Sequence, residues 1–291
     1  MIAIFKKEFK GLFHSPLAYI YLAVSTLIVG FFFWLYNLNG GYPSFNYCLG
    51  AMWPRLLTVA LLPLLTMRTF SEDMHNKSDQ MLLTAPVKLW QIALGKFLAV
   101  AAVLGIFCLI CCIFPLIIML KGDYYYLPAD YLIILMYFLY GCVFIAIGVF
   151  LSSITEYTAI SAVLSFISVA VIVIYSAIYT EIPTTGSGMM IGCLIVVALV
   201  ALLLYGVTKN SLAAFILGII GVVAVIVTYN VNDSALSTIY DAVLTRLDFS
   251  AGVTEIISSQ LLCLDSIILY LTTIALFVTL TVQGLHKRRW N

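Results

Sequence analysis

Long apolar runs alternate with short polar segments along the 291 residues of this chain. A helix needs about 20 apolar residues to cross a hydrocarbon layer of about 30 Å. Eight runs reach that length, and we expect about eight membrane-spanning helices: 17–38, 48–70, 89–120, 129–151, 157–180, 189–208, 212–231 and 263–285. Pro115 lies inside the third run and predicts a kink there, because proline removes a backbone hydrogen bond of the helix.

The composition agrees with a membrane protein. Apolar residues make up 64% of the chain, charged residues make up 9%, and the mean hydropathy is +1.13. A soluble domain carries roughly 25% charged residues. Long continuous runs predict helices rather than the alternating strands of a barrel, because each backbone polar group must be paired within the lipid. The predicted fold class is an all-α, polytopic integral membrane protein.

The basic residues predict the orientation. Eleven of the 14 Lys and Arg residues fall on one side of the predicted spans, and cytoplasmic segments retain positive charge. They are Lys6, Lys7, Lys10, Arg68, Lys77, Lys88, Lys96, Lys209, Lys287, Arg288 and Arg289, while Arg55, Lys121 and Arg246 lie on the other side. We therefore expect both termini in the cytoplasm.

The first fourteen residues have the pattern of an amphipathic helix. Apolar side chains recur at helical spacing, and Lys6, Lys7, Glu8 and Lys10 take the opposite face. Ser15-Pro16 then turns the chain into the first span. Segment 1–14 is predicted to be an interfacial elbow helix, or alternatively a simple basic topology anchor.

Catalytic motifs are missing from the sequence. No phosphate loop or nucleophile elbow occurs, and Gly95-Lys96 lacks the residues that flank a phosphate loop. His14, His75 and His286 are isolated, and most cysteines lie within apolar runs, which is typical of packing residues rather than metal ligands. We expect no catalytic residue, no metal or cofactor site in this chain, and no nucleic-acid partner.

The predicted spans contain few charges. Asp130, Glu156 and Asp265 fall at span ends, and Arg55 lies near the outer end of the second span, where its side chain can extend to the interface. Ion-coupled carriers and voltage-gated channels use charges inside the membrane. The pattern disfavours both classes and favours a machine powered from outside the membrane domain.

The polar segment 68–90 is the largest predicted cytoplasmic loop. Ser78 can cap a short helix that carries Met81, Leu82 and Leu83 and ends at Pro86. An exposed apolar cluster of this kind needs a partner, either lipid headgroups or another protein.

A second amphipathic segment, 232–262, precedes the last span on the predicted external side. Its first apolar stripe includes Leu244 and Leu247, and a second stripe follows Gly252. The segment predicts two short external helices, or alternatively a linker at the interface.

Several stretches resemble the ABC type-2 permease family in the family's order, and the similarity is closest to the GldF-like, gliding-motility-associated branch. The stretches are Ser15–Tyr19, Leu64–Arg68, Phe70–Asp73, Leu82–Val87 with Gly95-Lys96, 148–157 (GVFLSSITEY) and Lys287–Trp290. Two features depart from the family pattern. Asp73, Met74, Lys77 and Ser78 replace the usual loop residues, and hairpin 189–231 adds two spans to the common six.

The resemblance implies a single transmembrane domain over 1–291 that serves as the permease subunit of an ATP-driven exporter. It implies two copies of a separate ABC ATPase that bind ATP and Mg, a second permease subunit, and the lipid of a bacterial cell membrane. The ATPase-coupling residues would be Glu72, Asp73, Met81, Leu82, Leu83 and Pro86, and Leu244 and Leu247 would belong to external gate helices. An auxiliary subunit with an external domain is compatible. The alternatives are a mechanotransmitting membrane subunit that drives an external partner and an ion-coupled carrier.

Overall fold

The computed structural model describes residues 1–78, 87–121, 127–178, 248–259 and 264–290, together with positions 190, 194, 221, 225 and 246. The chain divides into two compact units, one made of Met1–Val173 with Phe249–Asn291 and the other of Ile174–Asp248. All regular secondary structure in the described residues is helical, which confirms the all-α prediction. The following description concerns the first unit.

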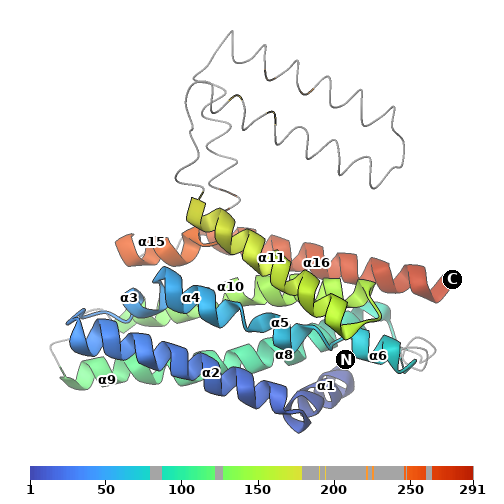
Figure 1. Cartoon of the computed structure of the whole chain (residues 1–291), viewed down its shortest axis with the longest axis horizontal. Coiled ribbons are helices and arrows are strands. Elements are labelled where there is room, and N and C mark those ends of the chain that lie inside the picture. The colour runs from blue at the N-terminus through green and yellow to red at the C-terminus, as the bar shows by residue number, and fades with distance from the viewer. Residues whose placement is uncertain are drawn as a thin grey trace. The chain divides into compact units, whose positions relative to one another are not determined.

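The helices of this unit follow the chain in the order shown in Figure 1. They are α1 (Ile2–His14), α2 (Pro16–Phe33), the π-helical turn η1 (Trp34–Asn39), α3 (Asn46–Leu49), α4 (Met52–Val59), α5 (Leu62–Thr66), α6 (Ser71–His75), α8 (Leu89–Cys111), α9 (Ile113–Lys121), α10 (Leu127–Ile154), α11 (Thr158–Ile178), α15 (Ala251–Ser259) and α16 (Leu264–Trp290).

Five described helical segments are long and apolar enough to cross a membrane: Pro16–Asn39, Leu89–Leu120, Leu127–Ile154, Thr158–Ser176 and Leu264–Lys287. They correspond to the first, third, fourth, fifth and eighth predicted spans. The sixth and seventh predicted spans, within hairpin 189–231, lie outside the continuously described residues. The chain is an integral membrane protein.

The kink predicted in the third span is confirmed. Helix α8 ends at Cys111, and α9 begins at Ile113. Pro115 has no N–H to donate to the carbonyl of Cys111, four residues earlier, and its ring crowds that carbonyl. The helix therefore breaks at Cys112.

The prediction of one continuous helix over 48–70 was wrong. The structure has three short helices, α3, α4 and α5, separated at Gly50-Ala51 and Ala60-Leu61. Pro54 and Pro63 account for both breaks, because each removes the hydrogen bond to a carbonyl four residues earlier, at Gly50 and Val59. The second span is discontinuous as a result.

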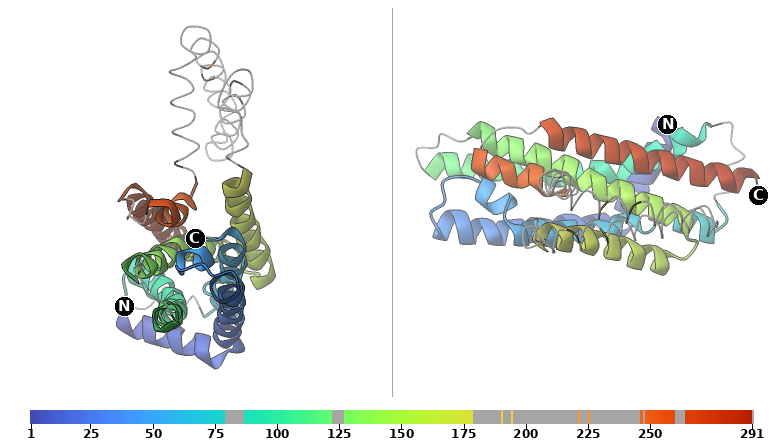
Figure 2. Two further views of the ribbon diagram at one scale, coloured as in Figure 1. Left: turned by 90° about the vertical axis from the view of Figure 1, so that its left-hand side faces the viewer. Right: turned by 90° about the horizontal axis from the view of Figure 1, so that it is seen from above.

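Helix α10 is the centre of the bundle, which Figure 2 shows end-on in its left view. In the most apolar 18-residue stretch of α10, 78% of the residues are buried, against 11–33% in the corresponding stretches of the other four spans. It packs against α16, α8 and α5. Gly148 permits the contact with α5, because a Cβ atom there would lie 2.3 Å from Oγ1 of Thr66 and 2.8 Å from its Cβ.

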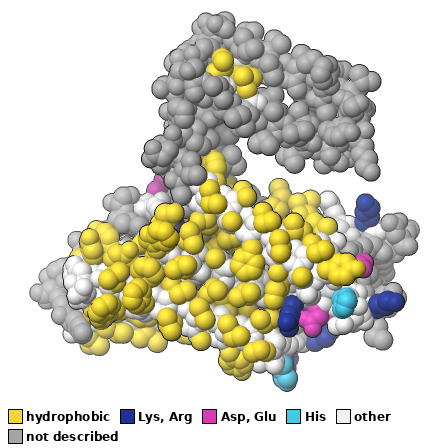
Figure 3. Space-filling model, in the orientation of Figure 1, with side chains coloured by type: hydrophobic (Ala, Val, Ile, Leu, Met, Phe, Trp, Pro, Cys, Tyr) yellow, Lys and Arg dark blue, Asp and Glu magenta, His cyan; other side chains and the backbone are white. Residues whose placement is uncertain are grey.

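The outer surface of the bundle is largely apolar, as the face in Figure 3 shows. Leu27, Leu109 and Ile268 are 71%, 70% and 59% exposed, as expected for side chains that contact lipid. The charged side chains visible on this face gather mainly at the end of the bundle that carries α6.

Helix α1 covers the segment predicted to be an elbow helix. Ser15 has an extended backbone, with φ −87° and ψ 150°, and its hydroxyl donates to the Leu12 carbonyl at 3.0 Å. Pro16 then begins α2. Helix α1 packs against α8 at Gly95, where a Cβ atom would lie 3.1 Å from Cγ2 of Ile4.

Candidate coupling site

The stem of loop 68–90 is described up to Ser78 and again from Val87. It contains α6 and a turn over Asn76–Ser78, in which Lys77 adopts a left-handed backbone with φ 55°. The predicted coupling residues Met81, Leu82, Leu83 and Pro86 lie outside the described residues, as do Leu244 and Leu247. The site described here is the stem that would carry the coupling helix.

Ser152 of α10 fixes one side of the stem. Its Oγ accepts hydrogen bonds from the backbone N–H groups of Phe70 and Ser71 at 3.0 and 3.1 Å, and it donates to the Met67 carbonyl at 3.2 Å. The turn between α5 and α6 is thus bonded to the end of the central helix. Because Ser152 is fully buried, these hydrogen bonds are shielded from water.

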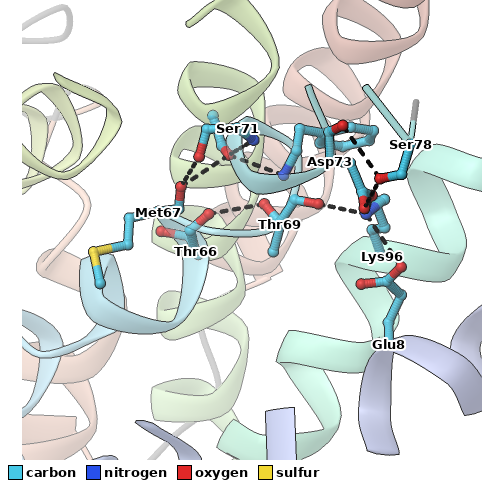
Figure 4. A network of polar contacts seen from close by, with 10 residues as sticks. Glu8, Thr66, Met67, Thr69, Ser71, Asp73, Ser78 and Lys96 are labelled. Atoms are coloured by element: carbon cyan, nitrogen blue, oxygen red, sulfur yellow. Dashed lines mark hydrogen bonds and ion pairs between the residues drawn. The ribbon is translucent and has the colours of Figure 1, made fainter. Parts of the chain in front are cut away.

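Lys96 of α8 fixes the other side of the stem (Figure 4). Its Nζ donates to Oδ2 of Asp73 at 2.5 Å, to Oε1 of Glu8 at 3.1 Å and to the Thr69 carbonyl. The three bonds use the full donor capacity of an ammonium group, and the side chain is only 1% exposed. Helix α1, the loop stem and α8 therefore meet at one buried charge.

Asp73 is held ionised within this group. Burial raises the pKa of its carboxyl, but the charge and hydrogen bond of Lys96, a hydrogen bond from Ser78 and the charge of Lys7 together outweigh burial, so the pKa lies below the ordinary 3.8. The Ser78 hydroxyl donates to Oδ1 of Asp73 at 2.9 Å. The last residue of the turn after α6 is thus bonded to the same carboxylate that Lys96 contacts.

A cavity of about 290 Å³ lies beside this ion network. It is bounded by α1, the start of α2, the loop stem and α8, and its charged lining residues are Lys7, Glu8, Arg68, Glu72, Asp73 and Lys96. Glu72 is exposed on α6, whereas Asp73 points to Lys96. In the described residues no three His, Cys, Asp or Glu side chains gather to hold a metal ion. The arrangement is suited to holding elements together and transmitting displacement.

Two further charges lie inside the bundle. Asp130, in the first turn of α10, accepts hydrogen bonds from Ser44 Oγ at 2.7 Å, Phe45 N at 3.1 Å and Asn46 N at 3.3 Å. Arg55 of α4 is 8% exposed, and its guanidinium carbon lies 6.0 Å from the ring centre of Tyr140. Asp130 therefore anchors the segment before α3, and Arg55 faces the central helix.

Comparison with family models shows which protein family the chain belongs to. The model for ABC-2 family transporter proteins matches residues 2–205, which is more than half of the chain. The chain belongs to the ABC-2 transporter family. A search of curated proteins found no match.

The match confirms the ABC-2 permease resemblance inferred from the sequence. Its range includes α1, loop 68–90 and all the spans up to α11, so the ion network of this ABC-2 protein lies within the matched part. An ABC-2 protein is a membrane component of an ABC transporter, which agrees with the absence of an enzyme motif from the sequence.

The structure revises one prediction about charge in this ABC-2 protein. Arg55 was expected to extend to the interface, but it is buried against Tyr140. The reason is that α4 packs against α10, where Thr58 is bonded to the hydroxyl of Tyr137 at 2.6 Å. Asp73 is paired with Lys96, and its role in coupling to an ATPase stays a prediction. Glu72 remains exposed and available for that role.

Lys96 was not predicted as a site residue. Its sequence signal is a single lysine seven residues into the apolar helix that begins at Leu89, where a buried cation needs a partner. The partners are 23 and 88 residues away, so no local pattern could identify them.

The cysteine prediction is consistent with the described part of this ABC-2 protein. Cys48, Cys108, Cys111, Cys112 and Cys142 have free thiols, and all but Cys112 are buried. Cys193 and Cys263 lie outside the described residues.

Proposed function

We propose that this protein is the permease subunit of an ATP-driven exporter, coupled through loop 68–90 to separate ATPase subunits that bind ATP and Mg. The observation that carries this proposal is the contact of Lys96 with Asp73 and Glu8. Membership of the ABC-2 family supports an ABC ATPase as the source of energy. We further propose that the chain belongs to the GldF-like branch of the family, which its sequence resembles.

The loop stem gives a displacement two routes into the membrane domain. Ser152 joins the stem to α10, and Lys96 joins it to α8 and α1. When the ATPase dimer closes on ATP and moves the loop, both α10 and α8 receive the displacement. ATP can shift the permease between two states only if the loop makes different contacts with the ATPase in each state.

The loop tip would supply the docking energy. Met81, Leu82 and Leu83 form its apolar cluster, ended by Pro86, and burying each large apolar side chain contributes about 1.5–3 kcal/mol. Glu72, exposed on α6, would pair with a basic group of the ATPase and set orientation more than affinity.

The proposed assembly contains two permease subunits, two ATPase subunits and surrounding lipid in a bacterial cell membrane. Helices α11 and α16 support it, because only 17% and 11% of the residues in their most apolar 18-residue stretches are buried within one chain. Their exposed faces are available to lipid or to a second permease. Both termini would be cytoplasmic, since both ends of the chain lie toward the end of the bundle that carries α6 (Figure 1) and the N-terminal helix α1 carries Lys6, Lys7 and Lys10. Leu244 and Leu247 stay predicted members of external gate helices.

The GldF-like resemblance also keeps a mechanotransmitting role as the alternative output. In that role ATP would drive a conformational signal to an external partner, and the auxiliary subunit would receive it. The Lys96 contact would transmit force in either case.

Purification of the tagged chain from its native membrane tests the proposal. We expect an ATPase with a phosphate-loop sequence to co-purify with it in equal amounts, and mass spectrometry would identify any auxiliary subunit. Recovery of the chain without an ATPase, together with ion-gradient-driven activity in vesicles, would refute the proposal and support an ion-coupled carrier.

A further inference from the structure

Arg55 lies at the middle of the bundle rather than at its end. Its guanidinium group is beside Tyr140, which is halfway along α10 (Leu127–Ile154). Thr58, one turn further along α4, bonds to the hydroxyl of Tyr137 at 2.6 Å, so α4 is fixed against the same face of α10. The position of Arg55 is therefore set by packing and not by access to water.

The charge of Arg55 is not balanced by an acidic side chain of the described residues. Its Nη1 atom is buried and has no hydrogen-bond partner. Asp130, a buried acid of α10, already accepts three hydrogen bonds from Ser44, Phe45 and Asn46. The ring of Tyr140 offers only a weak attraction at 6.0 Å.

An uncompensated cation at this depth is costly, and such residues are kept mainly where they bind something. The local backbone has the form that membrane proteins use at binding sites. Helix α4 is isolated by the breaks at Gly50-Ala51 and Ala60-Leu61, and discontinuous helices in a membrane commonly surround a substrate or ion. A binding site at Arg55 would take an anion, because the described residues around it do not supply one.

We infer that Arg55 binds the phosphate or carboxylate group of an amphipathic substrate. A planar guanidinium donates two parallel hydrogen bonds to either group. The substrate would have an apolar body, because α4 presents Trp53 and Leu57 to the lipid side, 59% and 39% exposed. This inference rests on the proposed function and specifies its substrate class.

A carboxylate from a second permease subunit is the competing partner. Arg55 faces the central helix α10, whereas the exposed faces available to a second subunit lie on helices such as α11 and α16. A partner's side chain would have to enter the bundle to reach it. The geometry favours the anionic group of a mobile substrate over a carboxylate fixed to a second subunit.

The test uses the purified chain without ATPase in an uncharged detergent, so a failure of coupling cannot affect it. The probe is dioctanoyl phosphatidic acid, and dioctanoylglycerol, which has the same chains and no phosphate, is its control. The readout is the shift in Tm with probe concentration, since a ligand that binds the folded state raises Tm. The variants are Arg55→Gln, Arg55→Lys and, as a control for loss of an exposed positive charge, Lys88→Gln.

We expect phosphatidic acid to raise Tm in the unchanged protein and in Lys88→Gln, with dioctanoylglycerol giving a smaller shift. Arg55→Gln should need about tenfold or more probe for the same shift, and Arg55→Lys should lie between them. Without probe, Arg55→Gln should keep or raise Tm, because it removes an unpaired buried charge. An unchanged probe response in Arg55→Gln overturns the inference. If that variant also loses dimer mass, Arg55 instead pairs with a carboxylate of the second subunit.

Discussion

Nζ of Lys96 lies 2.5 Å from Oδ2 of Asp73, so the two ends of loop 68–90 are joined by an ion pair. Asp73 is on the segment that enters the loop, and Lys96 is on the helix that leaves it. Glu8 of α1 contacts the same ammonium at 3.1 Å. A force on the loop tip therefore reaches α8 and the elbow helix together.

Replacing Lys96 with Met should lower stability and uncouple the ATPase. The change leaves Asp73 and Glu8, each 20% exposed, without their cation, and breaking a buried pair in this way costs about 3 kcal/mol. Thermal unfolding of the purified chain should show a lower Tm. The ATPase should remain bound, because the loop tip is intact, but its stimulation by the permease should fall.

Lys88→Met is the matched control for this variant. Lys88 is exposed at the start of the same helix, so its loss should change neither Tm nor ATPase stimulation. Full stimulation in Lys96→Met would show that force reaches the spans by another route.

The ion pair also predicts a pH dependence. The pKa of Asp73 lies below 3.8 in the folded chain, so its ionised form stabilises the fold at every pH above about 3.8, and this contribution is lost as pH falls through the lower folded-state value. The difference in Tm between the unchanged protein and Asp73→Asn should be constant from about pH 8 to about pH 5 and should shrink below about pH 3.8. A difference that disappears already near pH 6 would mean that burial, and not Lys96, controls this carboxyl.

Gly148→Ala should destabilise the bundle by about 1–3 kcal/mol, because the added methyl group overlaps Thr66 where α5 crosses α10. Gly105→Ala is the control, since its Cβ atom would meet only Phe138 at an ordinary 3.7 Å. Tm of the two purified variants measures the difference. Equal values would indicate that α5 can shift away from α10 without cost.

Single cysteines test the orientation. Tyr42→Cys, at a position 46% exposed in the first loop, should react with a membrane-impermeant reagent added to intact cells. Asn76→Cys, exposed after α6, should react only after the cells are opened. A cysteine at Asn46 would not test the orientation, because that residue is only 2% exposed and the reagent could not reach it. Labelling of Asn76→Cys in intact cells would reverse the predicted topology.

Much of the fold could be predicted because it depends on local patterns. The apolar runs gave five spans, Ser15-Pro16 marked the end of α1, and Pro115 marked the kink. Pro54 and Pro63 carried the same signal for the second span, but an apolar run of full length concealed it.

The site was less predictable because its contacts join distant parts of the chain. Lys96 and Glu8 are 88 residues apart, and Ser152 and Phe70 are 82 apart. Hydropathy indicates where a buried charge would need a partner and does not indicate which residue it is. The orientation of Arg55 depends in the same way on how α4 packs against α10.

The most direct test of coupling through loop 68–90 measures ATPase retention and activity in complexes purified with Leu82→Ser and Leu83→Ser combined. The two serine side chains should no longer bind the apolar groove of the ATPase. The permease should therefore release the ATPase on purification, although it should still insert and fold normally. Glu72→Lys should weaken the complex in a salt-dependent way. Ile2→Ser is the control, because it removes an apolar side chain that is 81% exposed on α1 and outside the loop. Coupling through this loop predicts loss of the ATPase in the Ser double variant and its retention in Ile2→Ser, and a fully stimulated, fully retained ATPase in the Ser double variant would contradict it.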